Sequence, residues 1–307
     1  RSTSIHGEIV EQKTLAETIK EISRKHLEEG NGLLLGQCIS AIGWVNGTVP
    51  NVRGIIELSM TDVAGAGIAV GAAMVGRRPI FVVRFQDFMM LGSSPFVNYA
   101  AKVKELHGKN APVFIRSLAS EGMGPVHSGV LHSVFMHFPG FRICSPITPK
   151  EYEEAWQVFM ENDDPMYVSE HRPSFNNKEE LLDIVQKGAS ITLYGISLPR
   201  FAMREAANML DSEGIRCNVI DILWLKPFEI TDRYVEPLKQ TKIGLVIDSS
   251  FEICGAARSI AYELSDASGY PVKALGLLDQ TKCMCHPFRN EAPDAQRIYD
   301  AVINILK

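Results

Sequence analysis

Four side chains that together could bind a flat, basic heterocycle each follow a strand-like segment of the sequence. They are Asp62, Phe85, Phe88 and His127. A carboxylate can pair with a ring nitrogen, aromatic rings can stack on a heterocycle, and a histidine can transfer protons near neutral pH. Because ligands in open parallel sheets bind beyond the carboxyl ends of the strands, we expect these residues along one edge of a sheet. The preceding strands are expected over residues 53–58, 79–85 and 111–118.

Each of these residues also has a simpler interpretation. Phenylalanines are most often core residues, and His127 is one of eight histidines. The glycine-rich segment after Asp62 is, taken alone, typical of a small-residue helix packed on a sheet. Gly67 and Gly71 are four residues apart, so they share one helix face on which another backbone can pack closely. The order of the residues along successive strands is what favours a binding site.

The composition indicates a globular chain with room for two hydrophobic cores. It has 307 residues, of which 46% are hydrophobic. The net charge of -5 and the lack of a lysine and arginine stripe give no reason to expect nucleic acid. No apolar run approaches the ~20 residues that cross a bilayer, and residues 1–12 lack the apolar core of a signal peptide. We therefore expect a cytoplasmic protein that does not bind a membrane.

The six cysteines favour reduced thiols over a disulfide framework, because they are far apart and several lie in apolar, strand-like runs. The segment Cys283–His286 could suggest a metal, but it has no second ligand pair at zinc spacing. We therefore predict no metal site on this chain. The cysteines are Cys38, Cys144, Cys217, Cys254, Cys283 and Cys285.

The N-terminal half predicts a parallel sheet between helices. A helix over residues 14–29 begins with Thr14 and Glu17 in capping-box spacing and ends at Gly30. Strands that are apolar throughout must be covered on both faces, which is typical of parallel sheets. Further strands are expected over 33–36, 141–146 and 166–171. Further helices are expected over 62–76, 96–106 and 128–138, and from a second capping box at 148–151.

A polar, proline-containing segment, residues 172–188, separates this half from a second α/β pattern. We therefore predict two tandem α/β domains, each a mainly parallel sheet flanked by helices, over residues 1–175 and 189–307, joined by a linker at 176–188. The expected strands of the second domain are 190–195, 216–222, 243–249 and 272–278, and its helices are 199–213, 256–266 and 293–306.

Several short motifs carry a resemblance to a known family. Residues 62–71 align without gaps to a Glu-Gln-Gly-x-x-Gly-x-x-x-Gly segment, residues 85–88 to Phe-x-Asp-Tyr/Phe, and His127-Ser128 to a His-Ser pair. On these motifs the chain resembles the β subunit of the thiamine diphosphate-dependent decarboxylase component of 2-oxo acid dehydrogenase complexes, within the transketolase-like family. The segment 124–127 equally resembles the Gly-Pro-Thr-His of transketolases. Other strings in family order are 97–102, 138–141, 145–146, 164–165 and 219–222.

The resemblance implies that residues 1 to about 175 hold the aminopyrimidine ring of thiamine diphosphate. Asp62 stands where the family has a glutamate that hydrogen-bonds the pyrimidine N1′ and so favours the tautomer that removes the C2 proton. Phe85 and Phe88 are then cofactor-binding residues, and His127 is, with Asp62, a catalytic residue. His132 is the other histidine that could face the reacting ring, although the alignment selects His127.

The resemblance also implies a partner. The family's diphosphate and magnesium motif begins with Gly-Asp-Gly, and that string does not occur in the 307 residues. We therefore expect an α-type subunit that carries the thiamine diphosphate-binding domain and the Mg2+ ligands, in an α2β2-like heterotetramer with the cofactor between different chains.

Two residues depart from the family pattern. Aspartate at position 62 is one methylene shorter than glutamate, which retracts the carboxylate by ~1.5 Å, and a misplacement of about 1 Å can cost ~100-fold in rate. The backbone could lie closer to compensate, another residue could take over, or the usual activation could be lost; we favour the first. Gln37 stands where the β subunits usually have an acid. Together the departures suggest a specialised branch.

The leading functional hypothesis is a pyrimidine-binding subunit of a two-component thiamine diphosphate-dependent enzyme. Such an enzyme cleaves a bond next to a carbonyl, by decarboxylating a 2-oxo acid and transferring the acyl or aldehyde unit. The Gly-Pro-Val-His string at 124–127 supports a second hypothesis, a split transketolase-like or carboligating enzyme with a sugar or 2-oxo acid donor. A third hypothesis, of another class, is a non-catalytic structural subunit.

Overall fold

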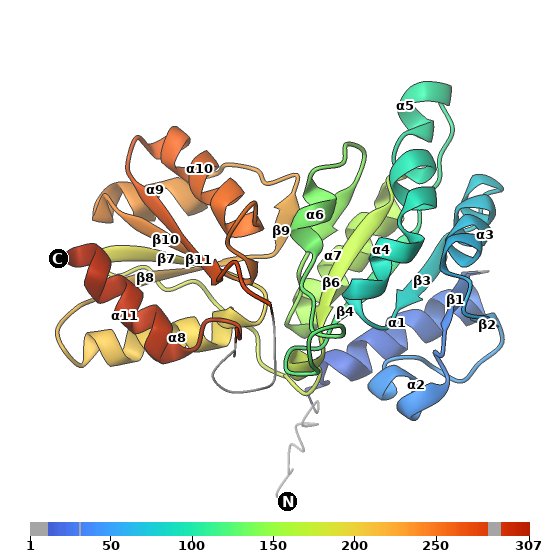
Figure 1. Ribbon diagram of the computed structural model, residues 1–307, viewed down its shortest axis with the longest axis horizontal. Helices are drawn as coiled ribbons and strands as arrows, with labels where there is room; N and C mark the ends of the chain where they lie inside the picture. Colours follow the sequence, from blue (N-terminus) through green and yellow to red (C-terminus); the bar gives the residue numbers. More distant parts are fainter. Residues whose placement is uncertain (1–11, 31, 282–289) are drawn as a thin grey trace, which may run out of the picture.

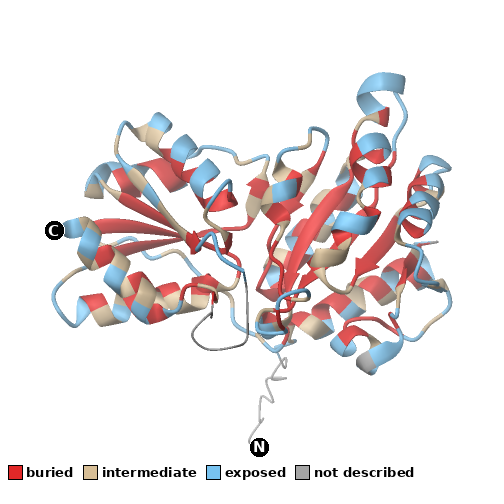
Figure 2. Ribbon diagram, in the orientation of Figure 1, coloured by how far each residue is buried: buried red, intermediate tan, exposed pale blue. Residues whose placement is uncertain are grey.

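The computed structural model describes residues 12–30, 32–281 and 290–307, and it contains two α/β units side by side (Figure 1). Each unit has a mainly parallel sheet with helices on both sides, so the predicted fold class is confirmed. The central strands of both sheets are buried, whereas the outward faces of the helices are exposed (Figure 2).

The first sheet has seven strands in the order β2-β1-β3-β4-β6-β5-β9. All neighbouring pairs are parallel except β5 with β9, which is antiparallel. The strands are β1 (Leu33–Gln37), β2 (Ile55–Leu58), β3 (Pro79–Val83), β4 (Phe114–Ala119), β5 (Arg142–Cys144), β6 (Met166–His171) and β9 (Trp224–Lys226).

Alternate residues of this sheet enter two different cores, which explains why its central strands are apolar throughout. In β3, Ile80 and Val82 pack in one cluster, whereas Phe81 and Val83 pack in the other. The helical segments over the sheet are α1 (Leu15–Glu29), α2 (Ala41–Gly47), α3 (Asp62–Met74), η1 (Gln86–Phe88), α4 (Met89–Gly92), η2 (Phe96–Ala100), α5 (Val103–His107), α6 (His132–Met136) and α7 (Pro149–Glu161), followed by η3 (Arg172–Ser174).

The second sheet has four parallel strands in the order β11-β10-β7-β8. They are β7 (Ile191–Ile196), β8 (Cys217–Ile222), β10 (Gly244–Phe251) and β11 (Val272–Leu277), and the helices that cover them are α8 (Pro199–Asp211), α9 (Asp232–Thr241), α10 (Ala256–Ser268) and α11 (Ala295–Leu306).

The helix-start signals in the sequence had two outcomes. Thr14 and Glu17 form the reciprocal capping box at α1. At α7 the Thr148 side chain accepts from the backbone N–H of Glu151, as expected. The Glu151 carboxylate, however, accepts from the Ile147 N–H and not from Thr148, so the second capping box is incomplete.

Several elements differ from the sequence expectation. The helix expected over 96–106 is divided into the π-helical η2 and the short α5, and the helix expected over 128–138 is only α6. Strand β9 has three residues, too few for a pattern, and α9 contains Pro237. Residues 43–47 of α2 form a left-handed turn, with φ from 53° to 77°, which glycine and asparagine tolerate best.

The two units share an interface. Strand β9 lies at the junction and adds to the first sheet, although it follows the predicted linker (Figure 1). Ile184, within that linker, forms an isolated antiparallel bridge with Val219. The boundaries 1–175, 176–188 and 189–307 therefore stay a proposal about how the chain divides. None of the helices in the described part of the chain combines the length and the apolar character needed to cross a membrane.

Candidate active site

A cavity of about 200 Å³ lies where β1 and β3 end and α3 begins. Three of the four residues selected from the sequence line it: Asp62, Phe85 and Phe88. Its other lining residues are Gln37, Cys38, Met60, Phe81, Val82, Val83 and Arg84. The strand-end rule therefore brings a carboxylate and two aromatic rings to one small, mainly apolar space, which is the kind of lining that small-molecule sites have.

Asp62 is the first residue of α3 and is partly buried. A negative charge in the first turn of a helix is stabilised by the helix dipole. The Thr61 side chain does not cap this helix. With its amide oxygen facing the helix, Gln37 accepts hydrogen bonds from the backbone N–H groups of Thr61 and Asp62, at 3.2 and 3.1 Å. Gln37 thus supplies the cap from the neighbouring strand β1.

Close packing also fixes the position of Asp62. A Cβ atom added to Gly92 of α4 would lie 3.1 Å from the Asp62 carbonyl oxygen and 3.3 Å from its Cβ. A larger residue at position 92 would therefore push against the start of α3.

His127 lies against both phenylalanines. Its ring centroid is 4.5 Å from that of Phe85 and 5.6 Å from that of Phe88, and the two phenylalanine centroids are 5.7 Å apart. All three pairs have the edge-to-face geometry that aromatic rings prefer. The structure therefore brings the fourth selected residue next to two of the others.

The loop that carries His127 is attached to the segment that carries the phenylalanines. The Asp87 carboxylate accepts from the Gly129 N–H at 2.9 Å, and the Gln86 side chain accepts from the Leu131 N–H at 2.6 Å. A Cβ on Gly129 would lie 2.7 Å from an oxygen of Asp87, so this position favours glycine. These bonds anchor Gly129 and Leu131, which precede α6 and which the sequence had assigned to a helix over 128–138.

His132, the alternative histidine, lies elsewhere. It is fully buried, and its Nε2 is 2.8 Å from Asp248 Oδ2 of the second unit, while its Nδ1 is 3.1 Å from Ser169 Oγ. Burial alone would raise the pKa of Asp248, but His132 and hydrogen bonds from Ser250 and Ser249 lower that pKa to about 2. These contacts hold His132 at the interface between the two units. His127 is therefore the histidine beside the candidate site.

A second carboxylate near the cavity has a structural role. Glu57, at the end of β2, accepts from the backbone N–H groups of Ile39 and Ser40 at 2.9 and 3.0 Å. These bonds fix the turn at Cys38, whose φ is 53°. Asp62 is therefore the carboxylate that lines the cavity, within the described residues.

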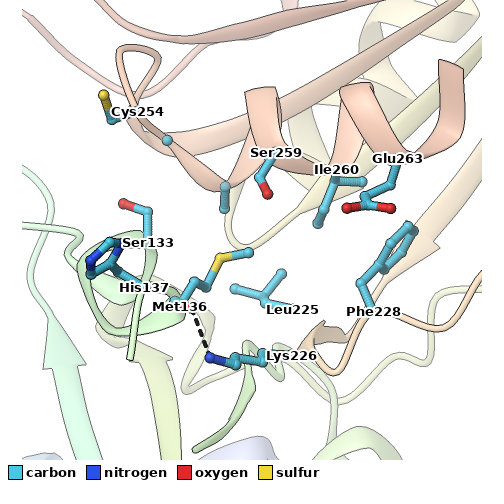
Figure 3. Close-up of a pocket in the computed structure, with 12 residues that line it drawn as sticks. Ser133, Met136, His137, Leu225, Lys226, Phe228, Cys254, Ser259, Ile260 and Glu263 are labelled. Carbon is cyan, nitrogen blue, oxygen red and sulfur yellow. Dashed lines mark hydrogen bonds between the residues drawn. The ribbon is translucent and has the colours of Figure 1, made fainter. Parts of the chain in front are cut away.

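A larger cavity, of about 410 Å³, lies between α6, β9 and the start of α10 (Figure 3). Its cation, Lys226, already donates to the carbonyl oxygens of Met136 and Phe138. None of the residues selected from the sequence lines this cavity, so size alone does not make it the site.

The sequence predicted that this chain has no metal site, and the structure describes only part of the residues that this prediction covers. Within the described ranges, no three histidine, cysteine, aspartate or glutamate residues are grouped so as to hold a metal ion. The segment Cys283–His286 lies outside the described residues.

Comparison with known protein families identifies both halves of the chain. Residues 50–178 match the transketolase pyrimidine-binding domain, and residues 181–285 match the transketolase C-terminal domain. The two matches follow one another and together cover more than half of the chain. The chain belongs to the transketolase-like family. The resemblance found in the sequence is confirmed.

Two relatives indicate the branch of the family. The chain is 29% identical to the β subunit of acetoin:2,6-dichlorophenolindophenol oxidoreductase of Cupriavidus necator, over 72% of this chain and 69% of that one. It is 27% identical to the β subunit of the pyruvate dehydrogenase E1 component of Rickettsia felis, over 67% of this chain and 68% of that one.

A solved structure confirms the fold of this transketolase-like chain. A split-gene transketolase, described as an inactive β4 tetramer, matches with a TM-score of 0.75 over 96% of this chain and 98% of that one, at 17% identity. At that identity the likeness concerns the fold alone.

Two neighbours of the site were not selected from the sequence. Gln37 was noticed only as a departure, because its contact with α3 joins residues far apart in sequence. Arg84 had a usable signal: it is a charged residue at the end of an otherwise apolar strand, directly before Phe85. The same strand-end rule that selected Phe85 applies to it.

Replacement of Gln37 tests the cap. Gln37→Leu leaves the Asp62 N–H without its acceptor, whereas the Thr61 N–H still donates to the Ser59 carbonyl oxygen at 2.7 Å. It should lower the free energy of unfolding by ~1 kcal/mol. Gln37→Glu keeps an acceptor and should stay within ~0.5 kcal/mol of wild type. Urea unfolding followed by circular dichroism measures both. Gln157→Leu, at an exposed site on α7, is the control, and a Gln37→Leu protein as stable as wild type would show that Gln37 does not cap α3.

Proposed function

We propose that this transketolase-like chain is the pyrimidine-binding, β-type subunit of a two-component thiamine diphosphate-dependent enzyme. The enzyme cleaves a bond next to a carbonyl, by decarboxylating a 2-oxo acid and transferring the acyl or aldehyde unit. The proposal rests on one observation: a carboxylate at a helix start lies with two aromatic rings in one cavity of about 200 Å³. The relatives named as pyruvate dehydrogenase and acetoin oxidoreductase β subunits support this reaction class.

The lining of this cavity fits an aminopyrimidine. The ring is flat and has a basic nitrogen, and the cavity offers aromatic carbon from Phe85 and Phe88 and one carboxylate, Asp62. When bound, thiamine diphosphate would supply a nucleophilic C2 carbon for chemistry at the carbonyl of the donor. Asp62 would hold a proton at the ring nitrogen and so tune the basicity of the neighbouring amino group.

The surroundings of Asp62 favour one of the three interpretations of its shorter side chain. A substitute carboxylate has little support, because both oxygens of Glu57 accept from backbone N–H groups. The tight contact with Gly92 and the cap from Gln37 instead hold the start of α3 in place. We infer that the backbone position compensates for the missing methylene.

His127 is proposed to act on the oxygen of the donor carbonyl. Its ring is partly exposed and is oriented by Phe85 and Phe88. A histidine can donate a proton to such an oxygen or accept one from it near neutral pH. The bonds of Asp87 and Gln86 to the loop keep the ring at the edge of the cavity.

An exposed apolar helix face supports the requirement for a partner. Residues 63–76, which comprise the rest of α3 after Asp62 and the two residues that follow the helix, carry no charged side chain. Gly67 and Gly71 share an exposed face, and an added Cβ on either would meet no atom of the described chain within 4 Å. The close backbone packing expected at these glycines is therefore not made by the described chain. Six large apolar side chains on α3, directly after it and on α4 are also exposed: Val63, Ile68, Met74, Val75, Met90 and Leu91.

Such a patch of apolar and small residues is typical of a surface that another chain covers. We assign the partner as an α-type subunit that carries the diphosphate-binding domain and the Mg2+ ligands, in an α2β2 assembly. The cytoplasmic location stays a prediction from the sequence.

A second candidate function is a split transketolase-like or carboligating enzyme. The Gly-Pro-Val-His string at 124–127 favours it. It would use the same cavity and the same partner domain, with a sugar or 2-oxo acid donor.

Asp62→Asn tests the proposed activation. The change removes the charge with little change in shape, so exchange of the cofactor C2 proton should slow by at least ~100-fold in the assembled enzyme. Hydrogen–deuterium exchange followed by NMR measures it. Asp62→Glu should also slow exchange if the backbone has compensated for aspartate, because the longer side chain would crowd the ring. Exchange at the wild-type rate in Asp62→Asn would favour a non-catalytic structural subunit instead.

His127→Ala tests the proton-transfer role. It should lower kcat by ~10²- to 10⁴-fold, the usual effect of a general acid or base, while thiamine diphosphate affinity stays within about threefold. Steady-state kinetics and calorimetry on the assembled enzyme provide the two values. His107→Ala, at the exposed end of α5, is the matched control. Unchanged turnover in His127→Ala would make this histidine a structural residue.

A further inference from the structure

We propose that Arg84 and Arg172 form an anion-binding site beside the candidate cofactor cavity, and that it takes the carboxylate or phosphate group of the donor substrate. The inference rests on the proposed function and extends it, because it assigns the donor a negative charge and names the residues that recognise it. A neutral hydroxyketone donor would not need such a pair.

The two guanidinium groups come from distant parts of the chain and both lie near the ring of Phe85, a residue that lines the cavity. Arg84 lines the cavity directly, at the end of β3, and Arg172 follows β6. Their Cζ atoms lie 5.6 and 5.0 Å from the centroid of the Phe85 ring. Arg172 is held in this position because it donates to the Asn46 side chain and, at 2.7 Å, to the Arg84 carbonyl oxygen.

Neither arginine has an anionic partner in the described part of the chain. Neither forms a salt bridge there, and the Arg84 guanidinium donates no hydrogen bond to any described residue. In addition, the Nε atoms of both are buried without an acceptor. Other arginines of this chain are paired: Arg116 with Glu170, and Arg200 with Asp221. Buried N–H groups without acceptors are uncommon in proteins, so this pair needs an explanation.

The electrostatics point in the same direction. Burial, and then the charge of Arg84, lower the pKa of Arg172 to about 10, so Arg172 stays charged at neutral pH next to another cation. The charge of Glu170 raises the pKa of Arg172 in part, but Glu170 already forms two hydrogen bonds with Arg116 and accepts a third from Tyr152. A bound anion would relieve this repulsion and would accept charge-assisted hydrogen bonds.

Asp62 and Arg84 line one cavity without forming a salt bridge, although their charges are opposite. Each is therefore available to a different group. Asp62 can pair with a basic ring nitrogen, whereas Arg84 and Arg172 can bind the negative charge of an acidic donor. Carboxylates and phosphates both suit this pair, because a guanidinium can bind either through two parallel hydrogen bonds.

The test compares donors of different charge in the enzyme assembled with its partner. Wild type, Arg84→Gln and Arg172→Gln are assayed with pyruvate for the carboxylate, fructose 6-phosphate for the phosphate, and acetoin as the neutral donor. Each variant should lose ~10- to 100-fold in kcat/KM for the anionic donor, mainly through KM, because a hydrogen bond to a charged group is lost. Activity with acetoin should change less than about twofold. The donor that shows the loss identifies the anion.

Arg24→Gln is the matched control, because Arg24 is exposed on α1 and pairs only with Glu28. Hydrogen–deuterium exchange at the cofactor C2 needs no donor and should be unchanged in Arg172→Gln, because Arg172 is not among the residues that line the cofactor cavity. Lack of exchange in wild type would contradict the proposed function itself. Normal exchange with equal losses for acetoin and the anionic donors would overturn only the anion site. Weaker binding of thiamine diphosphate in the variants would overturn it too, since the anion would then belong to the cofactor.

A second measurement on the wild-type enzyme covers the case in which the variants do not fold. Inorganic phosphate should compete with the anionic donor and raise its apparent KM, without changing the KM for acetoin. Phosphate inhibition of both donors to the same extent, or of neither, would contradict the inference.

Discussion

The position at which α3 begins is the constraint on which the rest of the site depends. This helix starts at Asp62, directly beyond the edge strand β2, and its first N–H groups are capped from β1 by Gln37. A helix start fixes a carboxylate more firmly than a loop does, because backbone N–H groups and the helix dipole stabilise the negative charge there. The same cap explains why an amide can replace an acid at position 37: both supply an acceptor oxygen.

The second half of the site is arranged around Phe85. The rings of Phe88 and His127 pack against its edge or face, and the guanidinium groups of Arg84 and Arg172 lie over it. One side chain therefore contacts a second aromatic ring, a histidine and two cations. The second unit contacts α6, which follows the loop that carries His127, through the buried pair His132 and Asp248.

The sequence predicted most of the fold and three of the residues that line the cavity, Asp62, Phe85 and Phe88, because these follow from local rules. Apolar strands alternate with capped helices, and chemically active residues follow strand ends, which selected Asp62, Phe85 and His127. What could not be predicted depends on contacts across the fold. Arg172 meets Arg84 from 88 positions away along the chain. The cap of α3 by Gln37 and the short strand β9 likewise depend on tertiary packing and leave no periodic signal.

The measurement that tests this account most directly is a structure of the assembled enzyme with thiamine diphosphate bound. The account predicts that the aminopyrimidine lies in the cavity at the start of α3, against Phe85 or Phe88. An oxygen of Asp62 should lie at hydrogen-bond distance from the ring nitrogen N1′, about 2.6–3.0 Å. A ring bound outside this cavity, or an Asp62 carboxylate that contacts no ring nitrogen, would contradict the account.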